Sequence, residues 1–168
     1  RGTAKIVLGL EDCLYLGNLD AKRDWGHAKD YVEGMYLILQ QDKADDFVLA
    51  SGITTTIRDF VKMSFAEVGI QIDFKGKNEK EEGYVVKNNG EYNLEIGKTV
   101  VKVNPKYFRP TEVDVLIGDA TKARTKLGWS PKHTLQDLVT DMMQSDIKVM
   151  QKETFLKEGG FQTKNYFE

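Results

Sequence analysis

The sequence predicts a mixed α/β fold in which helices and strands alternate within one compact unit. Apolar residues recur at helical spacing in some segments and at every second position in others. Glycines, prolines and short polar stretches separate these segments, and no internal repeat divides the chain. With 168 residues, the chain is long enough to bury a core as a single domain.

The composition argues against two classes of partner. The apolar fraction of 40% and the charged fraction of 30% are typical of a soluble globular protein. A net charge of -2 argues against a nucleic-acid partner, because neutralising phosphates requires a basic face. Every apolar run is shorter than the roughly 18 residues of a membrane span, so we expect no membrane partner.

The single cysteine and the first residues indicate the context of the chain. Cys13 has no second cysteine to pair with, which fits a reducing compartment, and we expect a cytoplasmic protein. The chain opens with "RGTAKIVLGL", without an initiator Met and already in a helical pattern. We therefore expect a fragment of a longer protein.

Five segments of the first half have the spacing of a helix or a strand. They are the end of a helix at 4–10, a short strand at 13–18 closed by a Gly17-Asn18 turn, a helix at 27–41, a strand at 45–52 and a helix capped by Thr56 that stops at Gly69. In the helix at 27–41, Val32, Met35, Tyr36 and Leu39 recur at helical spacing. This apolar stripe predicts a face that packs on a sheet.

The second half predicts three strands and two helices. They are strands at 70–76, 99–105 and 113–118, a helix that follows Asp119 and ends at Gly128, and a last long helix capped by Thr134. The inner side of the last helix is expected to carry Leu135, Leu138, Val139, Met142, Met143 and Ile147. Residues 77–98 are polar and glycine-bearing, so we interpret them as an exposed excursion with one short strand at 84–86. The polar tail over 152–168 is expected to be loose.

Most signatures of enzyme chemistry are absent from the sequence. It contains neither GxGxxG nor GxxxxGK[ST], so it has no phosphate-binding glycine loop of its own. His27 and His133 lie far apart with one cysteine, which argues against a zinc cluster. His27 at a helix start is typical of a capping residue, and Trp25 and Trp129 beside glycines are typical of packed plugs.

Two arginines remain as candidate ligand contacts. Arg23 precedes a helix in what we expect to be a loop, and Arg109 precedes a proline in an extended stretch. Two guanidinium groups from separate segments can clamp a diphosphate, because each pairs bidentately with phosphate oxygens. Asp24 and Glu112 follow closely, so the alternative is a pair of surface ion pairs.

Four stretches of sequence together resemble the C-terminal half of the GDP-mannose 4,6-dehydratase family. They are "CLYLGNLDAKRDWGHAKDYV", "FVLASG", "TIRDFV" and "YFRPTEVDVLIGDATKARTKLGWSPKHTLQDLV". The resemblance covers about 4–147 and matches poorly over 77–98 and after 152. It implies the C-terminal substrate-binding part of an extended Rossmann-type sugar-nucleotide enzyme, of the extended short-chain dehydrogenase/reductase class, lacking most of the nucleotide-binding sheet.

The resemblance also implies a reaction for the intact protein. The family converts GDP-mannose to GDP-4-keto-6-deoxymannose and water, in the route to GDP-fucose, with NADP moving a hydride from C4 to C6. The glycine-rich loop and the catalytic residues belong to the N-terminal half of the family. We therefore expect no catalytic residue and no NADP site in this chain, and no activity from it alone.

The site residues that the resemblance implies belong to the nucleotide-sugar side. Arg23 and Arg109 match the two diphosphate arginines, and Glu112 matches the acid that binds the ribose hydroxyls. The backbone at Leu16, Gly17 and Asn18 matches the segment that passes the nucleoside, and Tyr107 is expected on the same wall.

The resemblance further places residues 27–68 against the missing nucleotide-binding domain, within a single substrate-binding region over 1–168. We therefore expect a partner surface, either the N-terminal half or another chain, and a homo-oligomer. Two alternatives stay open: another sugar-nucleotide epimerase or dehydratase of the same family, and a non-catalytic nucleotide-sugar-binding protein.

Overall fold

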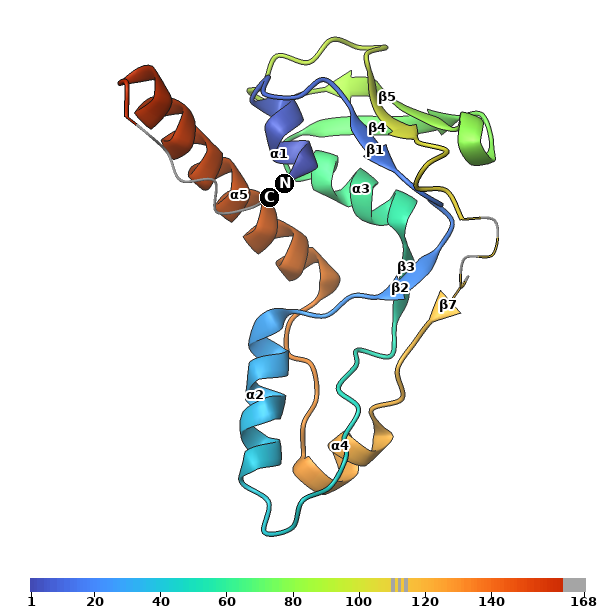
Figure 1. Cartoon of the computed structure of the whole chain (residues 1–168), viewed down its shortest axis with the longest axis vertical. Helices are drawn as coiled ribbons and strands as arrows, with labels where there is room; N and C mark the ends of the chain where they lie inside the picture. The colour runs from blue at the N-terminus through green and yellow to red at the C-terminus, as the bar shows by residue number, and fades with distance from the viewer. Residues whose placement is uncertain (110, 112, 114, 162–168) are drawn as a thin grey trace.

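A computed structural model describes residues 1–109, 111, 113 and 115–161 of the chain (Figure 1). It contains a four-stranded sheet, a three-stranded sheet and five α-helices in the described part. The mixed α/β class predicted from the alternating patterns is confirmed. None of the described helices combines the length and the apolarity that a membrane span requires.

The larger sheet has the strand order β1-β6-β5-β4. Its strands are β1 (Leu14–Leu16), β4 (Ile70–Lys75), β5 (Glu82–Asn88) and β6 (Thr99–Val103). β1 is parallel to β6, and the other neighbours are antiparallel. Helices α1 (Gly2–Val7) and α3 (Ile57–Ala66) lie beside this sheet, as Figure 1 shows.

The main core fills the space between this sheet and its helices. Its buried members come from α1, α3, the strands and the loop between β5 and β6, and they are Ile6, Val7, Val61, Phe65, Ile70, Ile72, Val85, Leu94, Val100 and Val101. Gly69 has a φ of +76°, which ends α3 and lets β4 start at once. The helix that was expected to stop at Gly69 and the strand expected at 70–76 are therefore confirmed.

The prediction of an exposed excursion over 77–98 is wrong in part: the short strand expected at 84–86 forms within β5, and many residues of the segment are exposed, but the segment also contributes to the sheet and the core. β5 spans seven residues and lies between β4 and β6, and Val85 and Leu94 belong to the buried core. The polar composition was misleading because burial alternates along the first half of β5, with Gly83 and Val85 buried and Glu82 and Tyr84 more exposed. Glu81, in the charged run before β5, is also buried.

The smaller sheet has the order β3-β2-β7. It consists of β2 (Lys22–Asp24), β3 (Thr54–Thr56) and β7 (Val115–Leu116). Arg23 was expected in a loop, but it lies in the middle strand, paired with Thr55 and Leu116. The expected strand at 113–118 forms over Val115–Leu116. Thr56 caps α3 as predicted, accepting the Asp59 N–H at 3.0 Å.

No strand forms over 45–52, all of which the structure describes, so this prediction is wrong. A strand needs a paired strand for its N–H and C=O groups, and none of the described strands pairs with this segment. Helix α2 (Ala28–Leu39) forms as expected, but its apolar stripe is open. Val32, Met35, Tyr36 and Leu39 are between 58% and 80% exposed.

A second, smaller core joins α2 to α4 (Thr121–Leu127). Its buried members are Ala50, Ala120, Ala123 and Trp129. Trp129 is 2% exposed, which confirms its role as a plug, and Gly128 ends α4 in the left-handed region as predicted. Trp25 stacks on Phe60 with ring centroids 4.5 Å apart, so it also packs.

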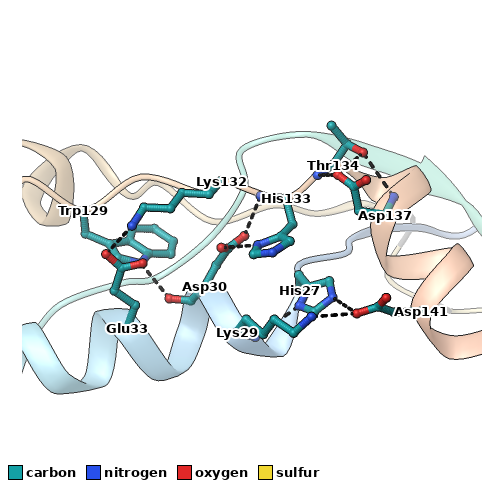
Figure 2. Close-up of polar contacts among 10 residues, drawn as sticks. All are labelled: His27, Lys29, Asp30, Glu33, Trp129, Lys132, His133, Thr134, Asp137 and Asp141. Atoms are coloured by element: carbon teal, nitrogen blue, oxygen red, sulfur yellow. Dashed lines mark hydrogen bonds and ion pairs between the residues drawn. The ribbon is translucent and has the colours of Figure 1, made fainter. Parts of the chain in front are cut away.

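Buried Asp30 connects α2 to the chain segment that leads into the last helix (Figure 2). Its carboxylate accepts the His133 N–H at 3.1 Å and lies 2.7 Å from His133 Nδ1. Its backbone carbonyl accepts the indole N–H of Trp129 at 2.8 Å. Burial raises the pKa of Asp30, but the hydrogen bonds from His133 outweigh it and hold this pKa below its usual range.

His27 caps α2, as expected, and is buried rather than exposed. Its Nδ1 accepts the Lys29 N–H at 3.2 Å, and its Nε2 lies 3.1 Å from Asp141. Because Nδ1 accepts a hydrogen bond, the proton of the neutral ring belongs on Nε2, facing the carboxylate. The ring stacks on His133 with centroids 4.4 Å apart (Figure 2). These contacts tie the start of α2 to the last helix.

The last helix, α5, runs from Leu135 to Glu158. Thr134 and Asp137 form a complete capping box at its start, which confirms the predicted cap. The prediction of a loose tail from residue 152 is wrong as far as residue 158, because α5 continues through this polar stretch. Residues 162–168 lie outside the described part. Met142 was expected on the inner side but is exposed, while Val139 and Met143 are buried.

Candidate functional site

A cleft of 290 Å³ lies where the two sheets and the start of α3 meet. The described residues that line it are Gly17, Asn18, Ala21, Arg23, Ile57, Lys106, Tyr107 and Arg109. They come from four segments: the loop after β1, strand β2, the first residue of α3 and the turn after β6. The loop after β1 forms the first wall and the turn after β6 forms the second wall, and both extend from the larger sheet. Arg23 reaches the cleft from the smaller sheet.

The loop after β1 enters the cleft because β1 ends in the parallel pair with β6. The Leu16 carbonyl accepts the Asn104 N–H at 2.9 Å, so Leu16 remains part of the sheet edge. Gly17 then approaches the turn after β6 so closely that a Cβ on it would lie 2.5 Å from the Tyr107 carbonyl oxygen. Only glycine tolerates this approach without displacement. Asn18 accepts the Asp20 N–H at 3.0 Å, which shapes the loop as an Asx turn.

The second wall is a turn organised by Asn104. Its carbonyl accepts the N–H groups of Tyr107 at 2.9 Å and Phe108 at 3.0 Å, and its side chain accepts the Lys106 N–H at 2.9 Å. The turn presents Lys106, Tyr107 and Arg109 to the cleft. Tyr107 is 54% exposed, so its ring is accessible to a ligand.

Arg23 reaches the cleft from the middle strand of the smaller sheet. Its Nη1 donates to the Lys22 carbonyl at 2.8 Å and to the Val113 carbonyl at 3.0 Å. These bonds hold the guanidinium group in a defined orientation beside the chain that precedes β7. Three of the described lining residues are cationic, Arg23, Lys106 and Arg109, and none of those described is acidic. The cleft is therefore suited to an anion.

Asp24 supports β2 from the side away from the cleft. Its carboxylate accepts hydrogen bonds from Ser51 Oγ at 2.5 Å, Ser51 N at 3.0 Å and Gly52 N at 2.9 Å. Burial raises the pKa of Asp24, but these bonds and a longer one from Gly118 N outweigh it, so this pKa lies below its ordinary value. The alternative role of Asp24 in a surface ion pair is replaced by a structural one, which sequence spacing did not reveal.

The structure brings most of the predicted site residues together. Gly17, Asn18, Arg23, Tyr107 and Arg109 all line the cleft, whereas Leu16 lies beside it in β1. Glu112 lies outside the described residues. Three further lining residues were not predicted, Ala21, Ile57 and Lys106. Of these, Lys106 has a recognisable signal, as a cation adjoining Tyr107.

Known structures define the fold. The chain superposes on RMD from Pseudomonas aeruginosa complexed with NADPH with a TM-score of 0.63 at 15% identity, covering 88% of this chain and 40% of that one. It superposes equally well, at 17% identity, on the UDP-glucose 4-epimerase of Stenotrophomonas maltophila, covering 90% of this chain and 39% of the epimerase. The fold is that of a C-terminal part of extended Rossmann-type sugar-nucleotide enzymes, as predicted.

Sequence comparison defines the family within that class. The profile of the GDP-mannose 4,6 dehydratase family matches residues 1–142. The chain is 47% identical over 163 residues to the GDP-mannose 4,6-dehydratase of Yersinia enterocolitica and 51% identical over 150 residues to the human enzyme. The chain belongs to the GDP-mannose 4,6-dehydratase family.

The match covers most of this chain but a minority of its relatives. It includes 96% of the chain and 44% of the Yersinia protein, and 89% of the chain and 38% of the human protein. The chain thus spans less than half the length of these curated relatives.

Proposed function

We propose that the intact protein, meaning this chain together with the N-terminal part that its relatives possess, is a GDP-mannose 4,6-dehydratase. It converts GDP-mannose to GDP-4-keto-6-deoxymannose and water in the cytoplasm, as a step toward GDP-fucose. This chain supplies the side of the site that binds the GDP-sugar. The observation that carries the proposal is the cleft, in which two arginines from distant segments face a glycine-bearing loop.

Each residue has a role that follows from its chemistry. Arg23 and Arg109 bind the diphosphate, because guanidinium groups form charge-assisted bidentate bonds with phosphate oxygens. The backbone from Leu16 to Asn18 and the ring of Tyr107 flank the nucleoside. Glu112 accepts hydrogen bonds from the ribose hydroxyls, a role that rests on the family resemblance alone.

The residues of this chain do not fit a dinucleotide of their own. The sequence has no GxGxxG loop, and the segment at 45–52 has no neighbouring strand to build a nucleotide-binding sheet. We therefore assign NADP, which supplies hydride transfer when bound, to the N-terminal part. No catalytic residue of the redox step is assigned here, and the chain alone is expected to be inactive.

The open face of α2 supports the proposal that the N-terminal part packs on this region. Its four exposed apolar residues form one stripe, and exposed Val48 lies in the segment expected to close the edge of the missing sheet. Residues 27–68 are the proposed contact region. The homo-oligomer implied by the family remains a prediction.

Binding and product analysis on the intact protein test the proposal. We expect calorimetry to show that GDP-mannose and GDP bind with similar affinity, and that UDP-glucose and dTDP-glucose bind weakly or not at all. Mass spectrometry of the reaction should show a sugar product lighter by one water. Preference for a UDP-sugar with no loss of water would instead indicate an epimerase, and GDP-mannose binding without any product would indicate a non-catalytic binding protein.

A further inference from the structure

Arg58, in the first turn of α3, binds two carboxylates from two other segments of the chain. Its Nε and Nη2 donate to the two carboxylate oxygens of Glu81 at 2.7 Å and 2.9 Å, and its Nη1 donates to Asp20 at 2.6 Å. The side chain of Arg58 is 22% exposed and that of Glu81 is 7% exposed. The guanidinium carbon also lies 5.7 Å from the centre of the Phe74 ring. All three guanidinium nitrogens are thus engaged in one well-packed place.

One carboxylate belongs to the first wall of the cleft. Asp20 lies in the loop that carries Gly17 and Asn18, and its own N–H is bound by the Asn18 side chain. The backbone of α3 supports the same loop, since the Arg58 N–H donates to the Leu19 carbonyl at 3.0 Å. The side chain of Arg58 therefore adds a charged anchor to a loop already seated on the helix start.

The other carboxylate belongs to the support of the second wall. The Glu81 carbonyl accepts the N–H of Val103 at 3.2 Å. Val103 is the last residue of β6 and immediately precedes Asn104, which organises the turn that carries Tyr107 and Arg109. Arg58 thus bridges the loop of the first wall and the end of β6, from which the turn of the second wall begins.

Stability alone is a weak reason for such an arrangement. Burying an arginine and a glutamate removes both from water, and the attraction between them roughly compensates for that loss. A buried bidentate pair does, however, fix the relative position of the segments that it joins, because the guanidinium fork is rigid and directional. The pair is therefore better suited to setting a geometry than to stabilising the fold.

We propose that Arg58 is a positioning residue for the nucleotide-sugar cleft, which sets the spacing between the Gly17–Asn18 loop and the turn after β6 without touching the ligand. The inference rests on the proposed function of the cleft. It predicts that loosening Arg58 moves the two walls relative to each other and weakens the grip on the diphosphate, while the chemistry of a bound substrate is unchanged.

The test compares variants of the intact protein. Arg58→Lys keeps the charge but loses the fork, so we expect KM for GDP-mannose and Kd for GDP to rise by about tenfold, or ~1.4 kcal/mol, with kcat nearly unchanged. Asp20→Asn removes only the charge at the loop, and should give a smaller rise in both constants at an unchanged melting temperature. Lys62→Met is the matched control, since Lys62 lies on the same helix, pairs with Asp73 at 3.0 Å and also lies over the Phe74 ring.

The outcomes separate the two proposals. Wild-type protein that binds no GDP-sugar overturns the proposed function and the positioning role with it. If the wild-type protein, Arg58→Lys and Asp20→Asn all bind GDP-mannose with the same affinity, the positioning role alone is overturned. If Arg58→Lys does not fold, Asp20→Asn decides: wild-type constants in that variant count against the proposal. A rise in KM for Lys62→Met equal to that for Arg58→Lys would also refute it, because any loss of an α3 ion pair would then suffice.

Discussion

Replacing Gly17 with alanine perturbs the cleft at a point where the geometry gives the size of the effect. The added Cβ would lie 2.5 Å from the Tyr107 carbonyl oxygen and 3.2 Å from its carbonyl carbon. To restore a separation of 3.0 Å, which is the shortest that real Cβ atoms show, one wall must move by at least 0.5 Å. Both contacts are with backbone, so no flexible side chain can absorb the displacement.

This displacement has two measurable consequences in the intact protein. Overpacking at a backbone contact costs about 1–3 kcal/mol of stability, so the melting temperature should fall. The turn that moves carries Tyr107 and Arg109, so we expect GDP to bind about tenfold more weakly or worse, because ~1.4 kcal/mol of lost contact suffices for that. Calorimetry with GDP and a thermal unfolding series measure the two effects.

A second glycine serves as the control. Gly9 has a φ of +70° and no atom within 4 Å of an added Cβ, so Gly9→Ala strains the backbone by about 1 kcal/mol far from the cleft. It should lower the melting temperature and leave GDP affinity at the wild-type value. Wild-type GDP affinity in Gly17→Ala would refute the argument that this close approach shapes the binding site. Equal losses of GDP affinity in Gly17→Ala and Gly9→Ala would mean that general destabilisation of the fold causes the loss.

Three further predictions concern single side chains. Arg23→Ala should weaken GDP-mannose binding by about 2–3 kcal/mol, the range for a charge-assisted contact, and leave NADP affinity unchanged in calorimetry; equal losses for both ligands would make Arg23 structural. Asp24→Asn should lower stability near neutral pH by about 1–3 kcal/mol. Because the pKa of Asp24 is lowered in the folded state, the stability that its charge contributes is present above the unfolded pKa of about 3.9 and is lost as the pH falls through the folded pKa. In a pH series of thermal unfolding, the difference in stability between wild type and Asp24→Asn should therefore close on acidification. A gap independent of pH would mean that the charge is not involved. Thr134→Ala should cost about 1 kcal/mol and speed hydrogen exchange in the first turn of α5, with no effect on GDP affinity.

Local signals in the sequence were reliable where the structure is decided locally. Thr56 and Thr134 cap helices through bonds to residues three positions later, and Gly128 ends a helix through its own backbone conformation. Such contacts involve near neighbours only, so residue type and spacing are enough to predict them.

Strands were less predictable because a strand is defined by its partners. The apolar segment at 45–52 has strand composition but pairs with no strand in the described chain, whereas polar β5 lies between two paired strands. The burial of Glu81 was also not predictable from local sequence. A charged run is typical of a solvent-exposed segment, and its partner Arg58 is 23 positions away. The candidate site was found through family resemblance, since a lone arginine such as Arg23 has no distinguishing local pattern.

The parallel pairing of β1 with β6 also bears on when the cleft can form as the protein folds. Leu14 pairs with Val101, so the two paired strands are far apart in the sequence. By contrast, β4, β5 and β6 follow one another as a meander. Contacts between distant residues carry the larger entropic cost of loop closure and tend to form late. We therefore expect the two walls to meet in one of the last folding steps, so that nucleotide binding would report completely folded molecules and would fail in partly folded ones.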